Sequence, residues 1–306
     1  GMTAAPEVPA SFAGAKSALK LRLHGEIPLA ILQIELETTG AESAYPVVDD
    51  FGIVRCGVAV ETPDAFIDVN NDMIANWGVS SRELFQAAKE NHRGRDVTDI
   101  RRIGEKTYVF GDESFSAAVA LYPSMVRQFP VDGDPVLIPV ARQGVFLTGS
   151  HDLEGLRTAA ALGDKLLVSG ATPVSVTPLT ISDIFWSDQD WSWPTEVAAS
   201  PEVGLLQRRF RTILQARQKR AIDIGWDGVP VAEAQLVTRP DGSPWTIATW
   251  MSGTHTWLPV VDEYLLVRDD GSVEPIPMEK FLHSWAHRLE VTGNPRLYRV
   301  FDDLAP

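Results

Sequence analysis

Cysteine is almost absent from this sequence of 306 residues, which contains a single one, Cys56. No disulfide can therefore form within the chain, as is typical of proteins that work in a reducing compartment. Cys56 lies in the apolar run GIVRCGVAV. Because an unpaired cysteine is commonly a small buried side chain, and no activating group stands beside this one in the sequence, we expect Cys56 in the core and not at a catalytic centre.

Long hydrophobic runs and basic residues are also scarce. The sequence has no run of about 18 apolar residues, as a membrane-spanning helix requires, and no basic segment followed by an apolar one that would indicate a secretion signal. Its 27 basic residues are outnumbered by 41 acidic ones, for a net charge of −14. Such a surface repels nucleic acid and anionic lipid. We therefore expect a cytoplasmic protein that binds neither nucleic acid nor membranes.

The rest of the composition is that of a globular protein, with 44% hydrophobic and 22% charged residues. Helical and extended patterns follow one another without a regular βαβ alternation, which predicts an α+β fold with two domains of mostly antiparallel sheet and packed helices. We place a flexible tail at 1–14, the first domain at 15–182, a linker rich in Trp and Asp at 183–204, and the second domain at 205–306.

Two helices have clear start signals. Ser80 followed by Glu83 forms a capping box and predicts a helix that runs to about Asn91. Ser200 followed by Pro201 predicts the start of a second helix, over 201–221. This second helix holds the one basic cluster of the sequence, which either docks an acidic partner or domain, or lays its long stems over the core with the charged groups in water. The cluster consists of Arg208, Arg209, Arg211, Arg217, Lys219 and Arg220.

Residues 61–180 carry a resemblance to a known family. The segment contains ETPDAFIDVNNDMIANWGVSSRELFQAAKEN, then GDESFSAAVALYPSM, then GDPVLIPVARQGVFLTGS. These motifs resemble the YtpQ-like family of uncharacterised bacterial domains, which pair a carboxylate–Pro–Asp step with a similar helix start. The chain departs from the family where Arg142 is followed by Gln143 and not by an aspartate. The resemblance implies a cytoplasmic bacterial protein and no particular chemistry.

The segment DIFWSDQDWSWP, residues 183–194, is the most unusual part of the sequence. It holds Trp186, Trp191 and Trp193 among three aspartates. Trp191 and Trp193 alternate, so in an extended chain both rings face the same side. We interpret the segment first as a linker anchored across two domains by its tryptophans, and second as an exposed aromatic patch that binds a protein partner, since Trp is enriched at binding hot spots. A sugar or metal site is a third alternative.

Catalytic candidates are few. His151 and Asp152 are neighbours in GSHDLEG, and His255 lies between two threonines in GTHTW. Adjacent residues cannot by themselves form a catalytic relay, in which nucleophile, base and orienting group must point at one another. A helix N-terminus explains Asp152 more simply, because Asp is a strong N-cap. No phosphate-binding glycine loop or nucleophile elbow is found in the sequence.

One helical segment, 278–291, suggests a metal site. Glu279, His283 and His287 recur there at a spacing of four residues, and two histidines one turn apart can ligate zinc. At 100° per residue, however, the apolar side chains of this segment form the opposite face and must meet the core, which leaves the histidines in solvent. We therefore expect no metal and no cofactor.

These observations favour a non-catalytic cytoplasmic protein that works by protein–protein contact, with a partner protein or as a homo-oligomer. The alternative is a hydrolase-type enzyme whose site is assembled on folding from scattered residues such as His151, Asp152 and His255. The partner interpretation depends on the tryptophan-rich segment, and the enzyme interpretation depends on folding to bring these three residues together.

Overall fold

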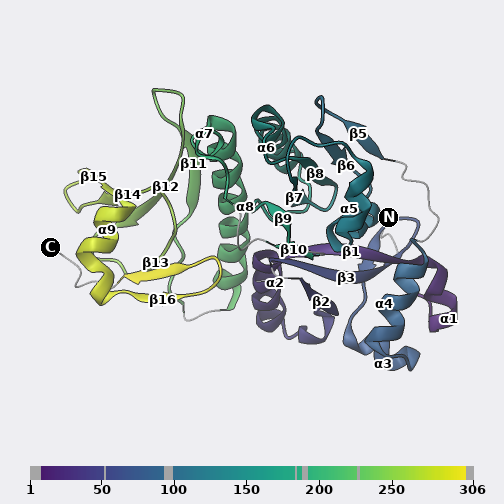
Figure 1. The fold of residues 1–306 in the computed structure, drawn as a ribbon. Coiled ribbons are helices and arrows are strands. Elements are labelled where there is room, and N and C mark those ends of the chain that lie inside the picture. The colour runs from purple at the N-terminus through teal and green to yellow at the C-terminus, as the bar shows by residue number, and fades with distance from the viewer. Residues whose placement is uncertain are drawn as a thin grey trace. The chain divides into compact units, whose positions relative to one another are not determined.

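The computed structural model describes residues 8–51, 53–92, 99–182, 185–187, 192–225 and 228–300 (Figure 1). The chain divides into two compact units. Unit 1 consists of residues 1–26 and 41–202, and unit 2 of residues 27–40 and 203–306. The boundary after residue 202 lies within the segment 183–204 that the sequence suggested as a linker. Helix α2 (Glu26–Thr39) belongs mainly to unit 2 despite its early place in the sequence.

The first sheet of unit 1 is antiparallel and built around β3, which pairs with all three other strands. Its strands are β1 (Leu19–Gly25), β2 (Val48–Phe51), β3 (Val54–Glu61) and β4 (Phe66–Asp68). The helices of this part are α1 (Phe12–Ala15), α3 (Asn71–Trp77) and α4 (Ser81–Glu90), and α4 contacts β1 and β3. Nearly every residue of β1 is buried, so the strand is covered on both faces.

The second sheet of unit 1 is also antiparallel, in the order β10-β9-β7-β8-β6-β5. Its strands are β5 (Ile100–Arg102), β6 (Tyr108–Phe110), β7 (Pro135–Ala141), β8 (Gly144–Gly149), β9 (Leu179–Ser182) and β10 (Phe185–Ser187). Its helices are α5 (Glu113–Leu121), α6 (Leu153–Val168) and α7 (Thr195–Ala198). Helix α5 contacts β1 of the first sheet as well as β6, β8 and β10 of the second, so it joins the two sheets into one core.

Unit 2 combines helix α8 (Pro201–Gly225) and most of α2 with two small sheets. The first sheet has the order β11-β12-β14-β15, in which β12 and β14 are parallel and the other pairs antiparallel. The second is antiparallel with the order β13-β17-β16. The strands are β11 (Ala234–Thr238), β12 (Pro244–Met251), β13 (Thr256–Pro259), β14 (Glu263–Val267), β15 (Val273–Pro277), β16 (Glu290–Thr292) and β17 (Leu297–Val300).

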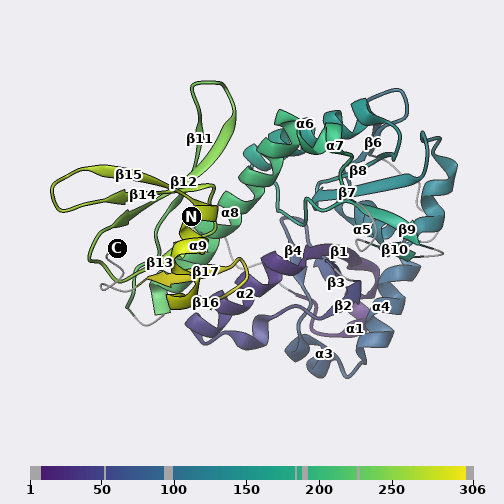
Figure 2. The same ribbon diagram turned by 60° about the vertical axis from the view of Figure 1, so that its left-hand side comes forward.

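Helix α9 (Met278–Trp285) packs its apolar side against these strands (Figure 2). Phe281 is fully buried, and its ring lies within 4.5 Å of Tyr264 and 5.3 Å of Trp285 between ring centroids. The apolar face expected from the sequence is therefore the face that packs. The helix is shorter than expected, because residues 286–288 continue as a 3-10 turn.

The α+β class predicted from the sequence is confirmed. The expected capping box is present: Ser80 Oγ accepts from the amide of Glu83 at 3.2 Å, and Glu83 accepts from the amide of Ser80 at 2.8 Å. The predicted second helix also begins at Pro201. The expected tail differs at its end, where residues from Phe12 onward form α1.

Gly149 marks a place where two backbone segments of unit 1 nearly touch. A Cβ atom at this position would lie 1.9 Å from the carbonyl oxygen of Asp132 and 2.4 Å from its nitrogen. The same two segments are joined by hydrogen bonds from the amide of His151 to Asp132 O and from the amide of Ser150 to Asp134 O. Only glycine permits this close approach.

We therefore predict that Gly149→Ala lowers the free energy of unfolding by about 2–3 kcal/mol, because the backbone of Asp132 must shift. Urea unfolding followed by circular dichroism measures the change. Gly104→Ala is the control: its Cβ would meet only the Thr107 side chain, at 3.2 Å. Equal stability of the two variants would contradict the packing shown here.

Candidate functional site

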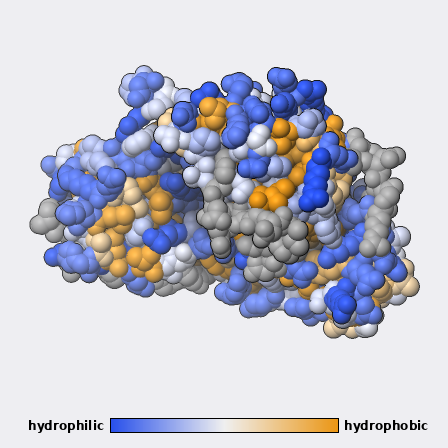
Figure 3. Space-filling model, in the orientation of Figure 1, coloured by the Kyte–Doolittle hydropathy of each residue, from blue (hydrophilic) through white to orange (hydrophobic). Residues whose placement is uncertain are grey.

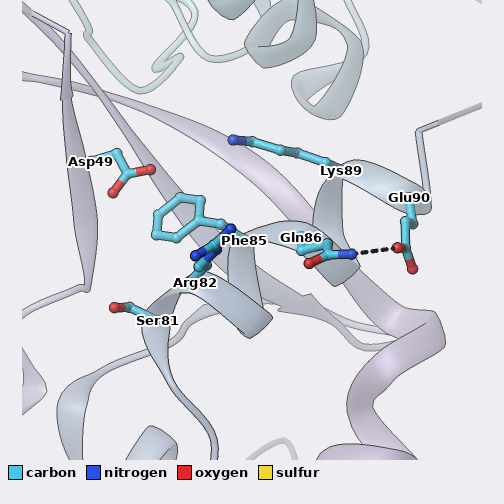
Figure 4. Close-up of a pocket in the computed structure, with 7 residues that line it drawn as sticks. All are labelled: Asp49, Ser81, Arg82, Phe85, Gln86, Lys89 and Glu90. Atoms are coloured by element: carbon cyan, nitrogen blue, oxygen red, sulfur yellow. Dashed lines mark hydrogen bonds between the residues drawn. The ribbon is translucent and has the colours of Figure 1, made fainter.

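A pocket open to solvent, with a volume of about 520 Å³, lies beside α4 in unit 1 (Figure 4). Strand β2 contributes Asp49, and all other lining residues belong to α4. These are Ser81, Arg82, Phe85, Gln86, Lys89 and Glu90. They recur every three to four residues, so they form one face of the helix.

Helix α4 is held firmly at both ends. Its start has the capping box described above, and its end is fixed by Asn91, whose amide donates to the carbonyls of Lys16 and Leu19 at 2.7 and 2.9 Å. Leu84 on the opposite face is fully buried in the core of unit 1. The pocket face is therefore presented by a rigid element.

The pocket combines an apolar floor with charges of both signs. The Phe85 side chain is almost buried and faces the Asp49 carboxylate, while Lys89 reaches over from α4 (Figure 4). The amide of Gln86 donates to Glu90 at 3.1 Å. Such a surface suits a ligand with an apolar group between polar or charged ones.

The one cysteine of the sequence is unsuited to nucleophilic chemistry. Cys56 is fully buried and its Sγ donates to the carbonyl of Gly57. Burial raises the pKa of its thiol to about 12. The side chain therefore remains a thiol at neutral pH, and it fills the core as expected from the sequence.

A second notable feature of unit 1 is a cluster of half-buried charged side chains around the buried His24, which we call the buried charge network. It comprises Arg22 and His24 of β1, Asp68 of β4, Glu113 of α5, and Arg142 in the turn between β7 and β8. Arg22 Nη1 donates to Asp68 Oδ1 at 3.0 Å, and Arg22 Nε lies 3.3 Å from Glu113 Oε2. The network thus ties α5 and the second sheet to the first sheet.

Arg142 fixes the protonation state of His24. Its Nη2 lies 2.7 Å from His24 Nδ1, and its Nε donates to the carbonyl of Leu23 at 2.8 Å. A guanidinium group can only donate, so Nδ1 must accept and carries no proton. The proton of the neutral ring is therefore on Nε2, which lies 3.5 Å from Asp68 Oδ1.

The pKa values agree with this arrangement. Burial lowers the pKa of His24, and the positive charges of Arg142 and Arg22 lower it further, against the opposing effect of Asp68. Burial alone would raise the pKa of Asp68, but the contacts with His24 and the two guanidinium groups outweigh it and hold this pKa well below its usual range. Asp68 is thus charged and His24 neutral at neutral pH.

The catalytic candidates from the sequence do not form a common site within either unit. His151 and Asp152 belong to unit 1 and His255 to unit 2. Asp152 caps α6, as predicted: its Oδ1 accepts from the amide of Gly155 at 2.8 Å, and its Oδ2 accepts from the hydroxyls of Thr107 and Thr148.

The other two candidates are histidines in ordinary surroundings. His151 is exposed beside Gly133. His255 Nε2 accepts from Arg299 Nε at 2.8 Å, so this nitrogen is committed to a structural hydrogen bond. The hydroxyls that contact Asp152, those of Thr107 and Thr148, belong to the cap of α6 described above.

The tryptophan-rich segment is described only in part. Trp186 is half-buried, packs against the core of unit 1, and donates from Nε1 to the carbonyl of Val119 at 3.1 Å. Trp193 is also half-buried, and Trp191 lies outside the described residues. Trp186 therefore anchors its segment to unit 1, and its indole N–H is not available to a ligand. Anchoring across both domains stays a prediction.

The proposed histidine pair of the second domain lies in solvent. His283 and His287 are both exposed, and His287 falls in the 3-10 turn after α9. Within the described ranges, no group of three or more His, Cys, Asp or Glu side chains is arranged to hold a metal ion. The same residues include no helix that is both long and apolar enough to cross a membrane.

Exposed apolar side chains are scattered. On the face seen in Figure 3, hydrophobic residues form patches bordered by hydrophilic ones. Among the described residues, the exposed large apolar side chains come from different parts of the chain: Tyr122, Val168, Met251, Val273 and Val291. They do not define an interaction face by themselves.

Sequence reasoning missed both the pocket and the buried charge network. The sequence predicts helix α4, which carries most of the pocket residues. The pocket also needs Asp49, which lies on a strand far from α4 in the sequence. Comparisons with protein families, curated proteins and solved structures find no significant match. The resemblance to the YtpQ-like family therefore stays a prediction.

We predict that the free energy of unfolding falls as the pH is lowered from about 6.5, the usual pKa of histidine. In this window the unfolded chain takes up a proton on residue 24, whereas the folded protein keeps His24 neutral because its pKa is lowered. Stability contributed by the neutral ring is thus present above this window and lost within it.

Urea unfolding between pH 8 and pH 5 measures this slope. In His24→Gln, an amide replaces the ring and does not titrate, so we expect a shallower slope than in the wild type. His151→Gln removes an exposed histidine of the same unit and serves as the control. A wild-type slope that survives in His24→Gln would show that another group is responsible.

Proposed function

We propose that this protein is a non-catalytic binding protein of the bacterial cytoplasm that holds a segment of a partner protein in the α4 pocket. The observation that carries the proposal is the pocket itself: an aromatic floor at Phe85, with Arg82 and Lys89 as cations and Asp49 and Glu90 as anions around it. A partner segment would place an apolar side chain on Phe85 and its polar neighbours against the charges.

The shape of the pocket favours a protein segment over a small substrate. Small-molecule sites enclose most of their ligand, whereas this pocket is formed by one face of α4 and a single strand residue and is open to solvent. Arginine and aromatic residues that surround a central apolar contact are also typical of the energetic centres of protein interfaces.

The residues of the pocket support binding and not catalysis. None of its lining residues is a histidine or a cysteine. Ser81 is its only hydroxyl side chain, and no histidine stands beside it in the lining to act as a base. The hydrolase alternative has no observation in its favour, since its three candidate residues serve a helix cap, a surface loop and an arginine contact.

We predict that reversing the pocket cations abolishes partner capture. A photoreactive amino acid is introduced at Gln86, whose side chain is exposed at the pocket, and the full chain is crosslinked in native extract. We expect one partner segment, identified by mass spectrometry, to be crosslinked at this position. The double variant Arg82→Glu/Lys89→Glu should reduce its yield about tenfold or more, because charge complementarity is lost.

Two controls make this test specific. Arg127→Glu reverses an exposed arginine of the same unit away from the pocket and should leave the yield unchanged. Crosslinking from Lys165, on the exposed side of α6, should not capture the same segment. The proposal fails if both crosslinking positions capture the same proteins, or if charge reversal at the pocket has no more effect than at Arg127.

A further inference from the structure

Beside the start of β12, unit 2 contains a group of side chains that has more hydrogen-bond donors than acceptors. Trp245 lies at the centre of this group. The guanidinium group of Arg239 lies 3.3 Å from the centroid of the Trp245 ring, and that of Arg208 lies 5.4 Å from it. Arg208 and Arg211 come from α8, and Arg239 comes from the turn between β11 and β12, which protrudes in both ribbon views (Figures 1 and 2).

The carboxylate of Asp262, at the centre of this group, is already engaged by four donors. Asp262 accepts from Arg208 Nε at 2.8 Å and from Arg208 Nη2 at 3.1 Å. It also accepts from the amide and the hydroxyl of Thr246, both at 2.7 Å. Oδ2 accepts three of these donors and Oδ1 accepts one, so only Oδ1 has room for a further donor. A second carboxylate, that of Asp241, acts on Arg239 through its charge, but it is exposed and accepts its hydrogen bonds from Ser243.

Three donors of this group are left over. In the part of the chain that the structure describes, neither the guanidinium group of Arg211 nor that of Arg239 donates to a protein acceptor, and the buried Nε1 of Trp245 has no hydrogen-bond partner. A buried donor without an acceptor, such as Trp245 Nε1, is costly and uncommon in folded proteins. The guanidinium group of Arg239 lies on the ring of Trp245, and Arg211 lies one helical turn from Arg208 beside Asp262. The three donors thus belong to one group, which an acceptor from outside the chain would complete.

Electrostatics support this view of Arg211. The side chain is half-buried, and burial lowers the pKa of its guanidinium group, as does the neighbouring charge of Arg208. Asp262 opposes this effect but is shared with Arg208. A half-buried cation whose nearby carboxylate is already paired is stabilised by a further anion.

We infer that Arg211, with Arg208, Arg239 and the indole N–H of Trp245, forms a binding site for an oxyanion, that is, a phosphate or carboxylate group of a small ligand. Guanidinium groups bind both kinds of anion through paired N–H donors. Asp262 orients Arg208 and keeps the site from being a bare cluster of cations. This site is in unit 2 and independent of the α4 pocket, so either proposal can fail alone.

Isothermal titration calorimetry of the full chain tests the inference, with inorganic phosphate and acetate as separate probes and sodium chloride at equal ionic strength as the blank. We expect one site per chain for at least one probe. Arg211→Gln should weaken it about tenfold or more, the usual value of a charge-assisted hydrogen bond. The preferred probe shows whether phosphate or carboxylate is the group recognised.

Arg220→Gln is the matched control, because Arg220 is an exposed arginine of the same helix. This variant should bind the probe as tightly as the wild type does. If Arg211→Gln loses the native circular dichroism spectrum, Arg239→Gln takes its place, since Arg239 is near the surface of the hairpin turn and should also weaken binding. The inference is overturned if neither probe binds the wild type more strongly than chloride, or if the folded variant binds as tightly as Arg220→Gln.

Discussion

The buried charge network is the constraint on which unit 1 depends. Asp68 on β4 forms an ion pair with Arg22 on β1, and Glu113 on α5 pairs with the same guanidinium group. Charges at this depth are strongly unfavourable unless each is paired, and removal of one partner typically costs about 3–5 kcal/mol. The positions of β1, β4 and α5 are therefore fixed relative to one another. Because α4 packs on β1, the pocket on its outer face rests on the same arrangement.

The network also accounts for the glutamine that follows Arg142 in the turn between β7 and β8. The side-chain amide of Gln143 donates to Glu113, and its carbonyl oxygen accepts from the amide of Thr172 at 3.2 Å. An aspartate has no donor to offer Glu113, and two carboxylates in contact repel each other. Gln143 therefore suits a chain in which Glu113 pairs with Arg22. Arg142, the residue before it, holds His24 neutral.

The parts of the fold that the sequence predicts are those with local causes. A cap is formed by residues three positions apart, so Ser80 with Glu83 and Asp152 with its helix are readable from the sequence. The apolar face of α9 follows from helical periodicity in the same way. The buried charge network is different, because its partners are far apart in the sequence: Arg142 and Leu23, for instance, are separated by 119 residues. No spacing rule connects them.

The assignment of helix α2 to unit 2 likewise depends on a residue far away in the sequence. Its apolar run is too short to tell helix from strand by periodicity, and its place in unit 2 depends on a distant residue. Arg217 of α8 donates to Glu35 through Nε at 2.7 Å and Nη2 at 2.5 Å, a paired contact across 182 residues. The sequence places Arg217 over the apolar stripe of α8 but does not supply its partner.

The proposed oxyanion site belongs to a strongly acidic chain. Whether an anion can bind there depends on how far the acidic groups lie from the site. The net charge of −14 repels an approaching anion, but at physiological salt exposed charges are screened beyond about 8 Å. The field at Trp245 is therefore set mainly by its near neighbours. There, three arginines stand against the paired carboxylate of Asp262 and the exposed carboxylate of Asp241. Higher salt weakens the distant repulsion as well as the local attraction, so the affinity of such a site should depend less on salt than that of a basic protein surface.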